Sequence, residues 1–417
     1  MNEQTTFWTK ASRDAALDEM QEFRSRMGGR YASGRNFDRG AGRHTGVSCL
    51  SPYVRRRLVL EEELVDTALA THGLDGAEKF IQEVFWRGYF KGWLERRPSV
   101  WQAYQDGLSQ DLFALDDDLK LARRVREAEE GRTSLECFDA WVEELVSTGY
   151  LHNHARMWFA SIWIFTLRLP WRLGADFFYR NLLDGDPASN TLSWRWVAGL
   201  HTRGKFYQAQ AWNIAKFTNQ RFAPRDRDLA DVIEGLQGTE PDGLPGVMPL
   251  RSLTAYDPAR PTALLLTEED CHPESWALTL PSECYVATLT ASHLRSERPV
   301  AEHVLRFEAE ALADTAQRLA KIPDMLTARD PRDLLKWAKG CEVSQIVTGY
   351  IPEGPLGDWM RGAGGLLQSE GIALVEVRRR WDDAIWPHAT AGFFKVKKQI
   401  PRILRDLELE DRQPRLL

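Results

Sequence analysis

A stretch rich in glycine and proline divides this chain into two parts of different character. It runs from Gly235 to Pro261 and begins GLQGTEPDGLPGVMPL. Such a composition is typical of a linker, because glycine and proline interrupt helices and strands. Before it, apolar residues recur at helical periods, for instance over residues 12–27, and alternating strand patterns are few. We therefore predict that the first part is helical.

After this stretch, short apolar runs alternate with helical segments. The expected strands are residues 263–267, 285–290, 345–350 and 372–377, and the clearest helices are residues 300–322 and 330–338. Buried parallel strands read as unbroken apolar runs, and their alternation with helices indicates βαβ units. The predicted fold class is multidomain α and α/β. The predicted divisions are a helical domain at 1–235, a linker at 236–260, a small doubly wound α/β domain at 261–405 and a tail at 406–417.

Composition excludes several classes of protein. No run of 18 or more apolar residues occurs, and the N-terminus lacks the order of a signal peptide, so we expect a soluble, cytoplasmic protein that does not bind a membrane. The five cysteines show no CxxC spacing, which argues against a zinc site or a disulfide framework, and no metal is expected. We also expect a monomer.

The net charge of −6 hides two strongly basic stretches. Residues 24–57 contain nine arginines against one acid, Asp38, and residues 195–227 contain seven Arg or Lys against one acid, Asp226. Phosphate groups respond to local surface charge rather than to net charge. The two stretches therefore predict basic surfaces for a nucleic-acid partner.

Two segments in the first part carry the most chemical information. They are GYLHNHARMWFAS at residues 149–161 and LLDGDPASNTLSWRW at residues 182–196. On successive helices they bring together two carboxylates, two asparagines, an arginine and a tryptophan pair, a set suited to gripping a flavin. Both segments resemble the flavin-binding core of the DNA photolyase and cryptochrome family, which implies FAD as the cofactor. The sequence does not identify an antenna pigment.

The resemblance implies a role for each polar residue of this core. Arg156 would pair with Asp184 near the isoalloxazine, and Asp186 would contact the ribityl chain or the ring edge. Asn190 falls where the family places the residue that faces flavin N5. An uncharged amide there favours the reduced, electron-donating state, whereas the aspartate of plant cryptochromes stabilises a radical suited to signalling. A plainer interpretation of the DGDP turn is a helix connection with Asp186 as its Asx residue.

Upstream, residues 31–56 resemble the family segment that ends in a TSxLSP motif and wraps the flavin phosphates. The resemblance implies that Ser48, the backbone of Leu50 and Ser51 hold phosphate and that Tyr31 lies nearby. A turn entering a helix suits an anion. The family's threonine is Val47 here, and a serine before a proline is also a common helix cap.

FIQEVFWRGYFKGWL at residues 80–94 is similar to the family helix that lines the cavity for a flipped dinucleotide. By resemblance, Trp86 would stack on a pyrimidine dimer, Glu83 would hydrogen-bond its base edges, and Arg87 would contact the DNA backbone or the cofactor. An i,i+4 salt bridge beside a core tryptophan is the simpler alternative. The family's next glutamate is Gly88 here.

Asn153 and Met157 match the asparagine and methionine of photolyases specific for cyclobutane dimers, whereas enzymes for the (6-4) photoproduct carry a histidine pair at these two places. His152 and His154 are close in sequence and point to different helix faces, so we expect them to be packing or surface residues rather than metal ligands.

Three tryptophans match the family's photoreduction chain: Trp194 nearest the flavin, Trp171 next, and Trp101 as a candidate for the surface member. After Trp196 the chain departs from the family and continues with a basic, aromatic-containing segment. There Arg203 and Lys205 are candidate DNA contacts, and the choice between single-stranded and duplex DNA stays open.

The order of the two parts is unusual for such a resemblance, because photolyases carry their α/β domain before the helical domain. The segment Trp381–Pro401 looks like the end of that N-terminal domain in ordinary members. A permuted photolyase is the preferred interpretation, and an unrelated α/β appendage is the alternative.

The leading functional hypothesis is a light-driven lyase that splits cyclobutane pyrimidine dimers in damaged DNA by electron transfer from reduced FAD. The second is a cryptochrome-like blue-light photoreceptor without repair activity. The third is a flavoprotein that has lost its light chemistry. Fold alone does not decide among them.

Overall fold

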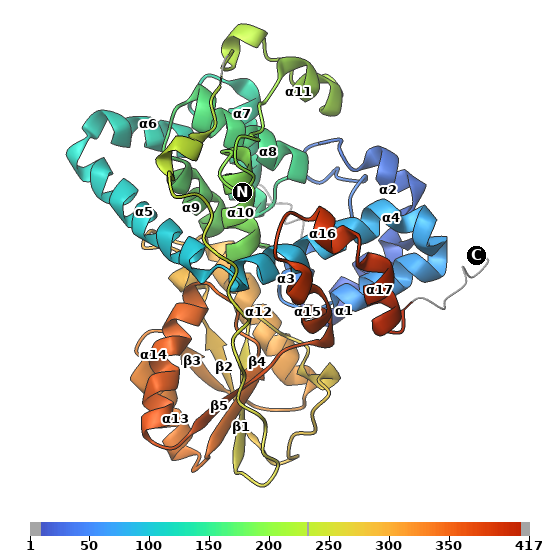
Figure 1. The fold of residues 1–417 in the computed structure, drawn as a ribbon, viewed down its shortest axis with the longest axis vertical. Helices are drawn as coiled ribbons and strands as arrows, with labels where there is room; N and C mark the ends of the chain where they lie inside the picture. The colour runs from blue at the N-terminus through green and yellow to red at the C-terminus, as the bar shows by residue number, and fades with distance from the viewer. Residues whose placement is uncertain (1–9, 232, 410–417) are drawn as a thin grey trace, which may run out of the picture. The chain divides into compact units, whose positions relative to one another are not determined.

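The computed structural model describes residues 10–231 and 233–409. Figure 1 shows their helices and strands. The described residues belong to two compact units, each assembled from separate stretches of the chain. The first unit comprises residues 26–49 and 97–247, and the second comprises residues 10–25, 50–96 and 248–409. The predicted divisions at 235 and 261 therefore differ from this grouping, because residues 50–96 pack with the C-terminal part.

The first unit is helical, as predicted. Its helices are α2 (Gly29–Gly34), α5 (Pro98–Asp117), α6 (Leu119–Glu129), α7 (Glu136–Thr148), α8 (Asn153–Ser161), α9 (Trp171–Asn181), α10 (Pro187–Val197) and α11 (Ala211–Phe217). A π-helical turn, η2 (Ile162–Thr166), continues α8, and short 3₁₀ turns lie at η3 (Asp226–Asp228) and η4 (Leu236–Thr239). The interior is rich in aromatic rings, of which Trp141, Trp158 and Trp163 are fully buried.

The second unit contains a five-stranded parallel sheet in the order β3-β2-β1-β4-β5. The strands are β1 (Thr262–Thr267), β2 (Tyr285–Thr290), β3 (Asp324–Thr327), β4 (Gln345–Gly349) and β5 (Ala373–Val377). Every residue of β1 and β4 is buried, which explains their unbroken apolar runs. The predicted strands are confirmed, and β3 was missed because it is a short, mostly exposed edge strand.

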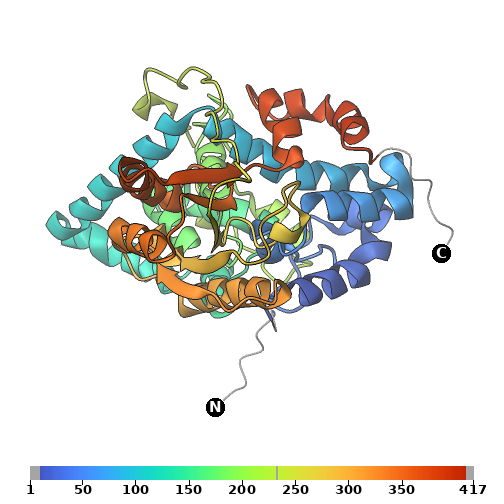
Figure 2. The ribbon, with the colours of Figure 1, turned by 90° about the horizontal axis from the view of Figure 1, so that it is seen from below.

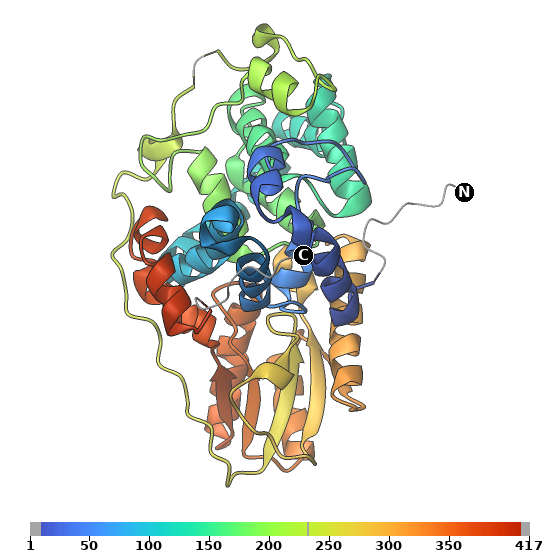
Figure 3. The same cartoon turned by 90° about the vertical axis from the view of Figure 1, so that its right-hand side faces the viewer.

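Helices cover both faces of this sheet, as Figures 1 and 3 show. They are α12 (Glu302–Arg318), α13 (Pro331–Gly340) and α14 (Pro355–Ser369). The helices α13 and α14 pack together on the face that presents Ala263 and Leu265 of β1. The helix α12 contacts β1 and β2 on the other face. The doubly wound α/β fold expected from the sequence is therefore present.

The remaining helices of the second unit come from both ends of the chain. They are α1 (Arg13–Phe23), α3 (Ser51–Arg55), α4 (Glu61–Glu95), α15 (Arg380–Ile385), α16 (Phe394–Lys397) and α17 (Ile400–Asp406). Short turns complete it at η5 (Pro273–Ser275), η6 (Ser292–Arg295) and η7 (Trp386–His388). Figure 2 shows α15 to α17 beside α4. The helix α4 is interrupted at Gly73, whose φ of 67° requires glycine.

Two glycines on α4 let the C-terminal segment approach its backbone. A Cβ on Gly88 would lie 3.0 Å from Ile385 Cδ1, and a Cβ on Gly92 would lie 2.6 Å from Trp386 Cδ1. The two positions are four residues apart and therefore share one face of the helix. Close packing against α15 and η7 thus explains the glycine at 88, where the resembling family has glutamate.

A buried charge network joins α3 to the carboxyl end of β1 within the second unit. Arg55 binds Glu269 at 2.7 Å, Arg56 binds Glu268 at 2.9 Å, and Arg57 lies 3.5 Å from Asp270. All three arginines are at most 3% exposed. The expectation that they contribute to a basic surface is therefore wrong, because three consecutive acids neutralise them in the interior.

Further cations and one further acid complete this network. Burial raises the pKa of Glu268, but Arg295 and the neighbouring arginines outweigh it and hold that pKa well below its usual range. Arg379 makes two bonds to Asp270, at 2.6 and 2.7 Å, and Arg57 makes two to Asp382, at 2.6 and 2.8 Å. Each buried charge is thus paired, as a low-dielectric interior requires.

Candidate functional site

The predicted cofactor residues of the first unit meet where α8, the turn after α9 and α10 come together. Arg156 on α8 donates through Nη2 to Asp184 Oδ2 at 2.9 Å and through Nε to the carbonyl of Leu151 at 2.8 Å. Its guanidinium carbon also lies 5.5 Å from the centre of the Tyr150 ring. Asp184 is 7% exposed, whereas the Arg156 side chain is 23% exposed. The pair is therefore fixed on one side and accessible on the other.

Asp186 and Asn190 lie on the first turns of α10. Asp186 caps the helix, because its Oδ1 accepts a hydrogen bond from Ser189 N at 2.7 Å. Asn190 Nδ2 donates to the carbonyl of Ala175 on α9 at 2.8 Å, which fixes the orientation of its amide. Both side chains are buried. The plainer role considered for Asp186, a residue of the turn that connects the helices, is thus present.

The chemistry of this set suits a flavin. An isoalloxazine presents carbonyl oxygens, a ring N–H and a ring nitrogen along one edge, and these need donors and acceptors that are held in place. The guanidinium of Arg156, the carboxylates of Asp184 and Asp186 and the amide of Asn190 offer both kinds of group within a largely buried setting. Such convergent polar groups in an aromatic interior are typical of cofactor sites.

The two histidines of α8 serve packing and capping. His152 is fully buried and its Nδ1 accepts a hydrogen bond from His154 N at 3.2 Å, so it caps the helix. Burial, with His44 nearby, lowers the pKa of His152 to about 3, and burial also lowers that of His154. His154 stacks on Trp158 with ring centres 4.1 Å apart. Neutral, packed rings agree with the prediction that these residues are structural.

Asn153 and Met157, the residues predicted to meet a dimer, lie on α8 on either side of His154. Asn153 is exposed and Met157 is half-buried. Arg156, the predicted flavin contact, lies on the same helix. One short helix therefore carries the residues predicted for the substrate and for the cofactor.

The predicted tryptophans fall into two aromatic groups of the first unit. Trp194 is buried against Trp163, with ring centres 6.4 Å apart, and against Phe178 at 5.2 Å. Trp171 lies 5.8 Å from Tyr104, which stacks on Trp101 at 5.3 Å. Trp101 is only 2% exposed, so it does not form the surface member for which it was a candidate. The electron-transfer roles of all three stay predictions.

The predicted dimer-binding residues of α4 belong to the second unit. Glu83 and Arg87 are half-buried. Trp86 stacks on Phe393, with ring centres 3.9 Å apart and planes inclined by 15°. One face of its indole is therefore covered by the C-terminal segment. Sequence reasoning did not single out Phe393, although the aromatic pair at 393–394 was visible.

The predicted phosphate residues are divided between the units. Tyr31 and Ser48 belong to the first unit, where Tyr31 is buried and Ser48 half-buried. Leu50 and Ser51 belong to the second, where they begin the five-residue helix α3. Cys49 between them has a φ of 54°, so the backbone makes a left-handed turn at this point. Their role in phosphate binding stays a prediction.

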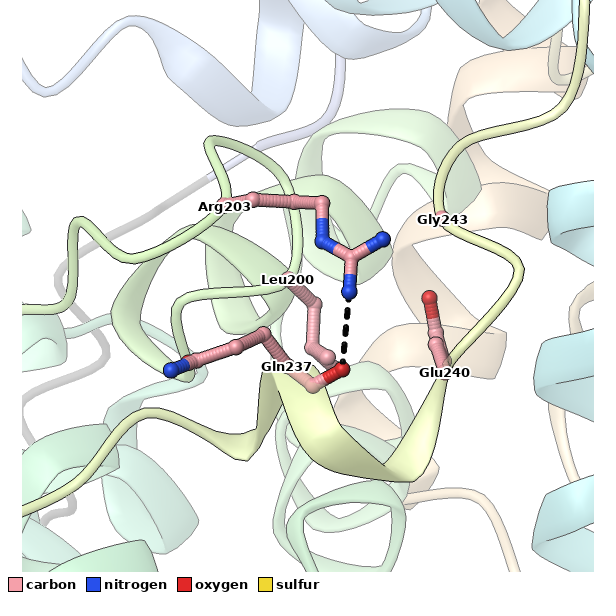
Figure 4. Close-up of a pocket in the computed structure, with 5 residues that line it drawn as sticks. All are labelled: Leu200, Arg203, Gln237, Glu240 and Gly243. Atoms are coloured by element: carbon pink, nitrogen blue, oxygen red, sulfur yellow. Dashed lines mark hydrogen bonds between the residues drawn. The ribbon is translucent and has the colours of Figure 1, made fainter.

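Arg203 and Lys205, the candidate DNA contacts, are both exposed. Figure 4 shows Arg203 beside the turn η4, where its Nη2 donates to the carbonyl of Gln237 at 3.3 Å. Gly243 has a φ of 77°, and a Cβ there would lie 2.6 Å from Arg203 Nη1. This contact holds Arg203 against its own chain, whereas no such contact is found for the Lys205 ammonium among the described residues.

Asp38 is a residue whose importance sequence reasoning missed. It was counted only as a lone acid among arginines, yet it is fully buried. Its Oδ2 accepts from Trp141 Nε1 at 2.9 Å and from Arg221 at 2.5 Å, and its Oδ1 accepts from Gly40 N at 3.0 Å. The only signal in the sequence was its isolation in a stretch of strongly basic charge.

Comparison with known proteins shows what the segment around this site is similar to. Residues 80–225 match the family model described as the FAD binding domain of DNA photolyase. The matched segment is similar to that flavin-binding domain, and it includes all four residues of the convergent polar set.

Individual relatives are similar over part of the chain. The chain is 36% identical over 157 residues to the deoxyribodipyrimidine photo-lyase of Streptomyces griseus, covering 37% of this chain and 33% of that one. It is 35% identical over 187 residues to an enzyme of that name from Thermus thermophilus, covering 45% and 42%. The chain thus spans less than half the length of these relatives.

Solved structures are similar over half of the chain. One is a bacterial class III photolyase from Agrobacterium tumefaciens, with a TM-score of 0.39, 25% identity and coverage of 50% of this chain and 43% of that one. Another is the Synechocystis cryptochrome, with a TM-score of 0.38, 22% identity and coverage of 50% and 44%.

Among the described residues, no helix is both long enough and apolar enough to cross a bilayer.

Proposed function

We propose that this protein is a light-driven lyase that splits cyclobutane pyrimidine dimers in DNA. The observation that carries the proposal is the composition of α8, where Asn153 and Met157 border Arg156 and its buried partner Asp184. Relatives that match part of the chain are named deoxyribodipyrimidine photo-lyase. Substrate contacts and cofactor contacts on one rigid helix would hold the reacting groups close together, which is the main task of the protein in cofactor chemistry.

Arg156, Asp184, Asp186 and Asn190 would hold FAD, and the reduced cofactor would supply a light-driven loan of one electron for opening the two carbon–carbon bonds of the dimer, with no net redox change. The chain's own residues do the positioning. Asn153 would hydrogen-bond the base edges of an extruded dimer, and Met157 would pack on its apolar face. Arg156 and Asp184 would hold the ring edge of the cofactor. Asn190 keeps an uncharged group in the site, which suits an electron-rich ring.

The test is a repair assay with purified protein whose bound flavin has been measured by absorbance and photoreduced with a thiol. Dimer-containing oligonucleotides, single-stranded and duplex, are illuminated with blue light beside a dark control. We expect light-dependent loss of dimers, a strong loss of repair in Asn153→Ala at unchanged flavin content, and full repair in Lys120→Gln, which alters an exposed charge on α6. Flavin that is reduced by light while every dimer survives would overturn the proposal.

A second candidate function, a blue-light photoreceptor, is favoured by the stacking of Phe393 on Trp86. An indole that is covered by its own chain has one face fewer for a dimer. This candidate requires flavin photoreduction without dimer binding. Phe393→Ala distinguishes the two, because a repair enzyme should bind a dimer-containing oligonucleotide at least as tightly when this face is uncovered, whereas a photoreceptor should still not discriminate damaged from undamaged DNA.

A further inference from the structure

The two basic stretches of the sequence come together on one surface of the first unit. Phe37 packs on Phe217 at the end of α11, with ring centres 5.2 Å apart, and Asp38 N donates to the carbonyl of Phe217 at 2.8 Å. Arg221 then binds Asp38 at 2.5 Å. These contacts join residues that are almost 180 positions apart in the chain. We name the area around them the Trp212 surface; it comprises the exposed residues Arg39, Arg43, Trp212 and Lys216 and the half-buried Arg35 and Arg221.

The arginine-bearing loop of this surface is held in place by hydrogen bonds of two buried residues, Asp38 and His44. Asp38 receives hydrogen bonds from Gly40, Trp141 and Arg221, as described above. A few residues later His44 Nε2 lies 2.7 Å from Glu144 on α7. Asp38, His44 and Glu144 lie close enough together for a metal ion, with ligand atoms within 4.8 Å. Since three donors already bind the oxygens of Asp38, we interpret the cluster as a latch that fixes the loop.

The charge of the Trp212 surface is of one sign. Residues 31–45 and 206–225 contain no acid other than Asp38, and Asp38 is fully buried. Arg39, Arg43 and Lys216 are exposed, and the Arg221 side chain is 26% exposed. Fixed cations without competing surface acids attract a phosphate backbone and release its counterions.

Trp212 gives this surface a second property. It is 60% exposed, which is unusual for so large an apolar side chain. Its Nε1 donates to Gln210 Oε1 at 2.7 Å, so the indole is oriented rather than buried. Lys216 follows four residues later on α11 and therefore shares its face of the helix. Exposed aromatic rings interleaved with cations are the pattern by which proteins bind single-stranded nucleic acid.

The surface borders α8. His154 Nδ1 lies 3.0 Å from the carbonyl of Asn36, and its ring centre lies 5.1 Å from that of Phe217. Asn153, the predicted dimer contact, precedes His154 and is exposed. A strand that presents a dimer to α8 would therefore pass the arginine loop and α11.

We propose that the Trp212 surface binds an unpaired stretch of DNA next to the dimer, with Trp212 stacked on a base and the cations on phosphates. This inference rests on the proposed function, and it adds a preference for single-stranded over duplex substrate. Stacking needs an unpaired base with a free face, which a closed duplex does not present outside its ends.

Binding of undamaged DNA in the dark tests the inference separately from repair. The probe is a fluorescently labelled 15-nucleotide oligothymidylate, compared with its duplex with oligoadenylate, and affinity is measured by anisotropy over a range of salt concentrations. The variants are Trp212→Ala, the aromatic replacement Trp212→Phe, and the double variant Arg39→Gln/Lys216→Gln. Phe113→Ala, which removes an aromatic ring that is 68% exposed on α5, is the matched control.

We expect Trp212→Ala to weaken single-strand binding about tenfold, within the range for loss of one stacked base. Trp212→Phe and Phe113→Ala should stay within about threefold of the unchanged protein, and duplex binding should change little. The double charge variant should lower the slope of log affinity against log salt by roughly 1.4, because each cation releases about 0.7 counterion on a single strand. Flavin content should be unchanged in every variant.

Three results would overturn the inference: single-strand affinity unchanged in Trp212→Ala, equal losses on single-strand and duplex probes, or loss of flavin from Trp212→Ala, which would make Trp212 a cofactor contact instead. Failure of the proposed function has a different signature, because dimers would then survive illumination while these dark binding differences remained.

Discussion

Removing the cation of Arg57 should destabilise the second unit more than any exposed charge change could. Arg57 and Asp382 are both nearly inaccessible, and two hydrogen bonds of 2.6 and 2.8 Å join them. In Arg57→Met the carboxylate of Asp382 stays buried without its principal partner, whereas Asp270 keeps Arg379. An uncompensated buried charge costs about 3–5 kcal/mol. This is a large fraction of a typical folding free energy of roughly 5–15 kcal/mol.

The assay is urea unfolding at pH 7, followed by tryptophan fluorescence and by circular dichroism so that separate transitions of the two units are recognised. Arg402→Met is the matched control, because its side chain is 67% exposed and lies 3.6 Å from Asp406. It should change the stability by less than about 0.5 kcal/mol. The double variant Arg57→Met/Asp382→Leu should recover part of the loss, since it removes the Asp382 carboxylate, whereas the buried Glu61, 3.6 Å from Arg57, stays. The reasoning fails if Arg57→Met and Arg402→Met have the same urea midpoint, or if the double variant is no more stable than Arg57→Met.

Three further predictions concern local packing and titration. Gly92→Ala should destabilise the protein by about 1–3 kcal/mol, because the new Cβ would lie 2.6 Å from Trp386. Gly365→Ala in α14, where a Cβ would have no atom within 4 Å, should stabilise the protein by roughly 0.5–1 kcal/mol. Thermal unfolding compares the two variants. Burial raises the pKa of Glu95 to about 7, so the folded state holds this proton and loses stability as the pH rises from about 4.5 to 7. In Glu95→Gln the urea midpoint of unfolding should depend less on pH over that range. An unchanged dependence on pH would contradict the assignment. The pKa shift of His152 acts in the opposite direction. Because its folded pKa is about 3, the stability falls as the pH drops below about 6.5. In His152→Asn, which keeps a capping side chain, the urea midpoint should fall less between pH 6.5 and 3.

The sequence predicted the elements whose side chains repeat regularly and missed those that depend on distant partners. Buried strands such as β1 were evident because all their residues are enclosed, whereas β3 at the sheet edge has no apolar pattern to detect. The packing of α4 on the C-terminal segment depends on Gly88 meeting Ile385, almost 300 positions away. A single sequence gives no sign of such a contact.

The candidate site shows the same division. Arg156 and Asp184 were expected to pair because a known family arrangement specified both, and they do form an ion pair. Trp101, by contrast, was a candidate for the surface member of a tryptophan chain only by resemblance to the family, and its burial is decided by what packs over it. The arginine triplet at 55–57 was interpreted as basic surface from the local excess of arginine, and the acids that neutralise it lie far away in the sequence.

The pairing of this arginine triplet with Glu268, Glu269 and Asp270 also affects how the protein is made. During synthesis the arginines leave the ribosome some 200 residues before the acids that neutralise them, so the second unit cannot close while the first half of the chain is being translated. Cutting the chain in the glycine-rich stretch would leave the three arginines in one fragment and their three acidic partners in the other. We therefore expect the two halves to fold poorly when they are expressed separately and to form the second unit only when they are expressed together.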